Sequence, residues 1–209
     1  MAVTEGGRAA TIGVKALPSG GDIVRRLIVT EFITLDGVVE APGGEASHPH
    51  AGWTLMYGTP ELYAFKLEET MEAESLLLGR KTFEQFEEAW PGRDGVFADK
   101  MNAMPKHVAT KRTDELGWNA TRIGDDVRAG VGELKAADGG PILVAGSATL
   151  AKSLLVWNLV DELRLLSYPV IVGGGLRMFP DDRGLATLEL TRLDRFDSGA
   201  VLHVYSFRG

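Results

Sequence analysis

Short apolar runs alternate along the chain with segments of helical period. The first run, residues 27–35, is rich in β-branched and aromatic side chains and ends at Asp36-Gly37, a dipeptide favoured in turns. Because few of its side chains are charged, it predicts a central strand that is buried on both faces. Later runs predict strands at residues 75–78, 106–110, 121–123, 142–145 and 162–170. Strands that alternate with helices indicate a parallel sheet with right-handed crossovers.

The segments between these runs carry signals for helix starts. Thr59-Pro60-Glu61 combines a side chain that can cap, a proline suited to the first helical position and an acid near the positive end of the helix. This helix is predicted to run to residue 73, and the side chains expected to face the core are Leu62, Phe65, Leu67 and Met71. Further helices are predicted to start near residues 79, 126 and 146.

The last part of the chain predicts an antiparallel hairpin, with strands over residues 188–196 and 201–207 around Asp197-Ser198-Gly199. The fold class that follows is α/β, with three αβα layers, a mostly parallel central sheet and the hairpin at one edge. A length of 209 residues suits one domain. We expect residues 1–24, which are rich in Gly, Ala and Thr, to form a flexible leader, and residues 25–209 to form the domain.

Composition excludes several classes of protein. A formal net charge of -7 disfavours nucleic acid as a partner, because phosphate backbones are bound by clustered Lys and Arg. The absence of cysteine rules out disulfides, thiolate metal sites and cysteine nucleophiles. No apolar run approaches the roughly 20 residues that cross a bilayer, and the N-terminus has no apolar stretch of signal-peptide type. We therefore expect a cytoplasmic protein that does not bind membranes.

Two strand-to-helix junctions share one feature, a glycine at the end of an apolar strand followed at once by small, basic or hydroxyl-bearing residues. They are Leu78-Gly79-Arg80-Lys81-Thr82, called here the Gly79 junction, and Gly146-Ser147-Ala148-Thr149-Leu150, called the Gly146 junction. Glycine lets a phosphate approach the backbone, and the helix start offers free N–H groups and a positive dipole end. Two such junctions on one sheet could hold a pyrophosphate. The alternative is that each glycine only makes a turn and each Ser or Thr only caps a helix.

Positive charge gathers near these junctions, at Arg80, Lys81, Lys111 and Arg112. Such a cluster is expected for the extra phosphate of NADPH, and the alternative is an ordinary solvated surface. No GxGxxG sequence follows a strand, so a Rossmann dinucleotide fold is disfavoured. The four histidines do not have a metal-ligand spacing with nearby acids, and no metal is expected.

Several segments of the chain form a recognisable set. They are Asp36-Gly37, Leu77-Leu78-Gly79-Arg80-Lys81-Thr82, the Gly146 junction, Val160-Asp161-Glu162-Leu163-Arg164-Leu165 and Pro169-Val170-Ile171-Val172-Gly173-Gly174-Gly175. Together they resemble the C-terminal reductase domain of the bifunctional riboflavin-biosynthesis protein, over residues 25–207. Trp53, Tyr57-Gly58, Trp90-Pro91 and Met101-Asn102-Ala103-Met104-Pro105-Lys106 are similar to a stand-alone bacterial branch of that superfamily.

The resemblance implies a dihydrofolate reductase-like fold and a homodimer. It also implies hydride transfer from NADPH to a pyrimidine or pterin-like small molecule, as in the 5-amino-6-(5-phosphoribosylamino)uracil reductases. Two alternatives stay open, a dihydrofolate reductase-type pterin reductase and an NADP-binding homologue without catalysis. The cofactor contacts implied are Ile33 near the nicotinamide, both glycine junctions at the phosphates, and Thr110 and Lys111 at the adenosine end.

Other residues are implied on the substrate side. Asp36 and Glu61 are the candidates for catalysis, although Asp36 could only make a turn and Glu61 could only complement the helix dipole. Trp53, Gly174 and Arg177 are the candidates for substrate binding, and Trp53 could instead cover the core.

Overall fold

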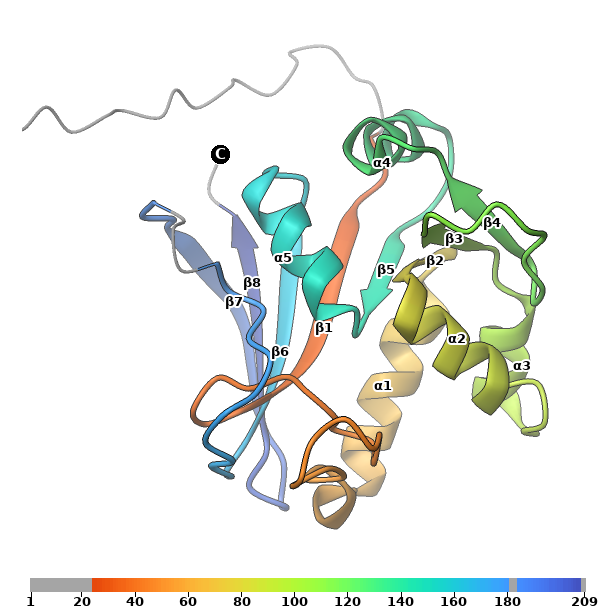
Figure 1. The fold of residues 1–209 in the computed structure, drawn as a ribbon. Helices are drawn as coiled ribbons and strands as arrows, with labels where there is room; N and C mark the ends of the chain where they lie inside the picture. Colours follow the sequence, from red (N-terminus) through yellow and green to blue (C-terminus); the bar gives the residue numbers. More distant parts are fainter. Residues whose placement is uncertain (1–23, 181–183, 208–209) are drawn as a thin grey trace, which may run out of the picture.

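The computed structural model describes residues 24–180 and 184–207, which form one eight-stranded sheet with helices on both faces (Figure 1). The strands are β1 (Leu27–Thr34), β2 (Ser75–Gly79), β3 (Lys106–Ala109), β4 (Ala120–Ile123), β5 (Ile142–Ala145), β6 (Glu162–Tyr168), β7 (Leu188–Arg195) and β8 (Val201–Phe207). The helices are α1 (Pro60–Glu72), α2 (Arg80–Ala89), α3 (Val96–Ala103), α4 (Val127–Ala136) and α5 (Ala148–Val156), with a 3-10 turn η1 (Leu55–Tyr57) before α1. The leader expected at residues 1–24 lies, up to residue 23, outside the described residues.

The strands are ordered β4-β3-β2-β5-β1-β6-β8-β7. The first six are parallel, β8 is antiparallel to β6, and β7 is antiparallel to β8. The predicted α/β class, with a mostly parallel sheet and an antiparallel C-terminal hairpin, is therefore confirmed. Because parallel strands point the same way, the six C-terminal ends lie along one edge, called here the carboxyl edge.

Alternate residues of β1 face two different helical layers. Val29 packs with Leu154 of α5 in a core cluster that also includes α4, and this side of the sheet is called the α5 face. Ile28 points the other way and packs with Phe83 of α2. Thr30, on the same side as Ile28, donates a hydrogen bond to Glu69 of α1 (3.2 Å). The helices α1 and α2 therefore cover the opposite side, called the α1 face.

The neighbouring strands β5 and β1 form a topological switch point. The chain leaves β1 towards α1 on one face and leaves β5 towards α5 on the other, and Figure 1 shows α5 crossing in front of the sheet. Ligands of open α/β sheets bind outside the carboxyl ends of the strands at such a point. A ligand site is therefore expected at the carboxyl ends of β1 and β5.

Several predicted strands run one or two residues past the observed ends, and Leu67, expected to face the core, is half-buried. Two larger differences concern the helices. Helix α3 was not predicted, because it begins after Gly95, which has φ 99° and offers no polar capping side chain. The expectation that Met71 faces the core is wrong, since Met71 is 49% exposed and Glu69 is 1% exposed. Glu69 is buried because it pairs with Lys66 and Arg164 against the sheet. Within the described residues, none of the helices has the length and hydrophobicity of a membrane span.

Candidate functional site

The two glycine junctions meet at the carboxyl edge. The backbone N–H of Gly79 donates a hydrogen bond to the Ser147 hydroxyl oxygen at 2.9 Å, across 68 positions of the sequence. Gly146 and Ser147 both adopt left-handed backbone, with φ 65° and 63°, and a glycine tolerates this conformation without strain. The structure therefore brings together the starts of α2 and α5, as the sequence prediction of one shared site requires.

Neither of these helices has a side-chain cap. At α1 the Thr59 hydroxyl accepts from Leu62 N, and at α4 the Asp126 carboxylate accepts from Ala129 N. Gly79 and Ser147 make no such bond at the starts of α2 and α5. Ser147 thus links the junctions instead of capping its own helix. The first N–H groups of both helices lack partners within the helix and form a positive end suited to an anion.

A basic pocket of about 820 Å³ lies beyond the Gly79 junction, at the ends of β3 and β4. It is lined by Arg80, Ala109, Thr110, Lys111, Arg112, Arg122, Gly124, Asp125 and Val127. Arg122, which the sequence analysis did not single out, donates from Nε to the Thr110 carbonyl (3.0 Å) and so fixes the end of β3. An arginine two residues before a strand-ending glycine gave no signal that distinguished it from a surface residue.

The four predicted cations are not equivalent. Arg80 pairs with Glu84 at 2.8 Å, and Arg112 pairs with both Glu84 (3.3 Å) and Asp114. The hydrogen bond with Asp114 is the main reason why the pKa of Arg112 lies above its usual value. Lys81 and Lys111 are exposed, and none of the ion pairs among the described residues includes them. Lys111 is therefore the cation of this pocket whose charge is least compensated.

Asp36 joins the end of β1 to the glycine triplet Gly173-Gly174-Gly175, which follows β6. One carboxylate oxygen accepts from the Thr34 hydroxyl (2.6 Å) and from Val172 N (3.3 Å), and the other accepts from Gly173 N (2.8 Å). These bonds, the one from Thr34 first, hold the pKa of Asp36 below its usual value. Asp36 is thus an ionised acceptor that positions a loop. Its catalytic role stays a prediction.

The glycine-triplet loop is also fixed by the long loop after β1. The His48 ring shares a hydrogen bond with the Gly174 carbonyl (Nε2 to O, 2.7 Å), and Leu176 N donates to the Glu40 carboxylate (2.9 Å). Arg177 reaches the Asp36 carbonyl from the same loop. Gly174 and Arg177 therefore lie beside Asp36, as a substrate site at the end of β1 requires. His48 and Glu40 were missed because their partners lie more than 120 positions away.

Trp53 lies in the core. Its ring is 7% exposed, its Nε1 donates to the Glu40 carbonyl (2.8 Å), and it meets Tyr168 edge to face with centroids 5.4 Å apart. This buried position agrees with the alternative that Trp53 covers the core. The predicted contact of Trp53 with substrate stays a prediction. Tyr168, at the end of β6, also meets Phe32 and Tyr57 and was not predicted as part of this cluster.

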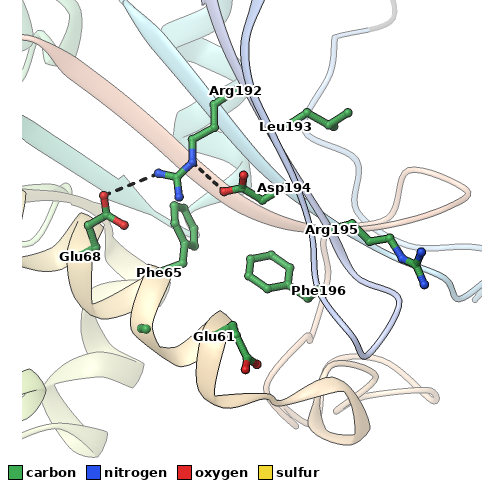
Figure 2. Close-up of a pocket in the computed structure, with 9 residues that line it drawn as sticks. Glu61, Phe65, Glu68, Arg192, Leu193, Asp194, Arg195 and Phe196 are labelled. Carbon is green, nitrogen blue, oxygen red and sulfur yellow. Dashed lines mark hydrogen bonds and ion pairs between the residues drawn. The ribbon is translucent and has the colours of Figure 1, made fainter.

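Glu61 lies apart from the junctions. It lines a groove of about 560 Å³ between α1 and β7, together with the ion-paired Glu68 and Arg192 (3.6 Å) and the side chain of Phe196 (Figure 2). None of the residues expected to bind the cofactor lines this groove. The structure therefore does not bring Glu61 together with Asp36, and its catalytic role remains only a prediction.

Two side chains of β1 face α5 near the switch point. Ile33, the residue expected near the nicotinamide, is buried in the cluster around α5. Glu31, two positions before it, is 5% exposed, and its Oε1 is buried without a hydrogen-bond partner in the described structure. Burial raises the pKa of Glu31 to about 8, against the opposing effect of the Lys66 charge. The signal that could have identified Glu31 is its position as the single acid in an apolar strand.

The chain matches a known family over most of its length. The model of the RibD C-terminal domain family matches residues 25–202. An uncharacterized protein of Bacillus subtilis (strain 168), YyaP, is 28% identical over 190 residues, which are 88% of this chain and 96% of that protein. A second uncharacterized protein of the same organism, YwjB, is 27% identical over 131 residues, 62% of this chain and 72% of that protein.

Solved structures share the fold at low sequence identity. A putative riboflavin biosynthesis protein from Shewanella sp. PV-4 superposes with a TM-score of 0.64 at 16% identity, over 88% of this chain and 99% of that one. A pyrimidine reductase-like protein from Corynebacterium diphtheriae gives 0.63 at 13% identity, over 93% and 96%. A diaminohydroxyphosphoribosylaminopyrimidine deaminase/5-amino-6-(5-phosphoribosylamino)uracil reductase from Thermotoga maritima gives 0.63 at 17% identity, over 88% of this chain and 57% of that one.

Proposed function

Because the chain belongs to the family of the RibD C-terminal domain, we propose that it is an NADPH-dependent reductase of the riboflavin-pathway type. Its substrate would be a pyrimidine or pterin-like small molecule. The observation that carries the proposal is the link between Gly79 and Ser147, which joins two uncapped helix starts beside a basic pocket. NADPH would use this combination, since its pyrophosphate and its third phosphate are separate anions.

The residues present fit this cofactor. The starts of α2 and α5 would hold the pyrophosphate, and the pocket lined by Thr110 and Lys111 would hold the adenosine end with its phosphate. Ile33 and the end of β1 would lie against the nicotinamide, at the switch point. The bound cofactor would supply a hydride, while the protein supplies orientation and a dry environment.

On the substrate side, the two loops that carry Asp36 and the glycine triplet support the proposal. The three bonds that Asp36 accepts hold residues 172–173 close to the end of β1. Arg177 adds a positive charge at this place, which suits a phosphate or carboxylate of the substrate. We propose that Asp36, Gly174 and Arg177 contact the substrate, with Trp53 supporting the wall behind them.

We also propose a homodimer that works in the cytoplasm, where NADPH is available. The support for pairing is the edge strand β7, whose Leu190 and Leu193 are 48% and 57% exposed. Exposed edge strands with apolar side chains are templates for pairing with another chain.

Titration of the full chain with NADPH and with NADH, followed by fluorescence and calorimetry, tests the function. We expect selective NADPH binding that Lys111→Ala weakens roughly 5- to 10-fold, the effect of one charge-assisted contact. Arg195→Ala is the matched control, because it removes the same charge from the groove of Figure 2. If the protein binds neither nucleotide, the proposal is wrong.

A further inference from the structure

Glu31 is the first residue of β1 beyond the end of β5. The last register pair between the two strands joins Thr30 to Ala145, after which the chain turns away at Gly146 into α5. Glu31 therefore has β6 on one side, in register with Leu165, and no strand partner on the other. The place where β1 and β5 separate is the switch point, and Glu31 is the first residue of β1 there.

The side chain of Glu31 points to the α5 face. Thr30 bonds Glu69 on the α1 face, so the alternation of a strand places Glu31 with Val29 and Ile33. The cluster on that face is apolar and includes Ala148 and Ala151 of the first turns of α5. Glu69 also has a buried oxygen without a hydrogen bond, but that oxygen pairs with Arg164, whereas no ion pair among the described residues includes Glu31. A carboxyl group 5% exposed in apolar surroundings with neither kind of partner for one oxygen is unusual in a protein that only needs to fold.

Few charges act on this carboxyl. Lys66 of α1 is the one that favours its ionised form, and it lies on the other side of the sheet, where it pairs with Glu69. The first turn of α5 carries no ionisable group. On the hairpin, His203 of β8 is in register with Leu165 and shares a hydrogen bond with Ser167. Burial dominates, and it raises the pKa of Glu31 to about 8, which favours the neutral acid over the carboxylate at pH 7.

We propose that the buried carboxyl group of Glu31 forms the hydrogen bonds that hold the carboxamide of the nicotinamide at the switch point. A carboxylic acid has one donor and one acceptor, and a primary carboxamide offers the complementary acceptor and donors. An ionised carboxylate could only accept, and it would leave the amide oxygen without a partner. This inference rests on the proposed NADPH-dependent function and assigns a residue to its cofactor end.

The experiment uses NADPH alone, so it does not depend on the substrate. Infrared difference spectra of the full chain with and without NADPH are expected to show a shift in the carbonyl stretch of a protonated carboxylic acid, and this signal should vanish in Glu31→Gln. The affinity of the wild type should fall about tenfold between pH 7 and pH 9, as Glu31 ionises. In Glu31→Gln the affinity should stay within about threefold at both pH values, because an amide also donates and accepts.

Two further variants complete the design. Glu31→Leu should lose at least about tenfold in affinity while circular dichroism shows the native fold. Glu68→Gln, in the groove of Figure 2, should behave as the wild type in the infrared spectra and in NADPH affinity at both pH values. NADPH binding that is unchanged in Glu31→Leu, or a wild-type spectrum without the carboxylic-acid signal, would overturn this inference alone. A wild-type protein that does not bind NADPH would overturn the inference together with the proposed function.

Discussion

Replacing Glu31 by glutamine should stabilise the protein, and the gain should grow with pH. The displacement of the Glu31 pKa from 4.5 to about 8 means that the folded state binds this proton more tightly than the unfolded state. The contribution of this bound proton to the free energy of unfolding is complete below pH 4.5 and is lost as the pH rises towards 8. At about 1.36 kcal/mol for each pH unit, the full loss is roughly 5 kcal/mol. Glutamine keeps the shape of the side chain and has no proton to lose.

The assay is equilibrium unfolding in urea at pH 5.5 and pH 9. The free energy of unfolding of Glu31→Gln should exceed that of the wild type by an amount that increases by roughly 3 kcal/mol between the two pH values. A difference that does not change with pH would refute the reasoning, because it would mean that Glu31 is already ionised in the folded protein at pH 5.5.

Glu69→Gln is the matched control on the opposite face of the sheet. Glu69 (1% exposed) is buried like Glu31 (5% exposed), but it pairs with Lys66 and with Arg164 (3.6 Å) and accepts from Thr30. Removing its charge leaves the half-buried Lys66 without its ion-pair partner and takes one of three carboxylates from Arg164, so the free energy of unfolding should fall by about 3 kcal/mol. Neutralising these two buried glutamates should thus change the free energy of unfolding with opposite signs.

Three further predictions address the carboxyl edge and the hairpin. Ser147→Ala removes the acceptor for Gly79 N–H and should cost about 1 kcal/mol of stability and weaken NADPH binding several-fold in a titration, whereas Ser153→Ala should change neither. Asp36→Asn should increase hydrogen exchange at Gly173, measured by mass spectrometry, without changing NADPH affinity; protection equal to the wild type would show that the loop is held by other contacts. Leu193→Glu should give monomers in analytical ultracentrifugation, and a wild type that is itself monomeric at micromolar concentration would contradict the dimer.

The elements that could be predicted from the sequence are those with local signals. Residues 142–145 and 201–207 are strands as predicted, because each is a short apolar or alternating run between turn residues. The start of α1 was predicted from Thr59, which caps it as expected. Helix α3 lacked such a signal at Gly95, and the inward side of α1 was assigned by hydrophobicity, which could not anticipate that Glu69 is buried by its ion pairs.

The candidate site divides in the same way. The two glycine junctions could be predicted, since a strand end, a glycine and a helix start are neighbours in the sequence. The contacts of His48 and Glu40 with the glycine-triplet loop could not, because they join residues that are distant along the chain. The sequence placed Glu31 in a buried strand. That Glu31 has no strand partner on the β5 side depends on the strand order, which a single run of residues does not reveal.

The separate anchoring of the two halves of the site has an evolutionary consequence. The junctions expected to hold the cofactor depend on the ends of β2, β3 and β5, whereas the loop with the glycine triplet is held by Asp36, Glu40 and His48 from the segment after β1. Residues 36–58 and 169–178 can therefore diversify as a pair, with compensating substitutions between them, while the half with the two glycine junctions stays constant. Such a division would let one scaffold be recruited to different substrates by changes in two contacting loops.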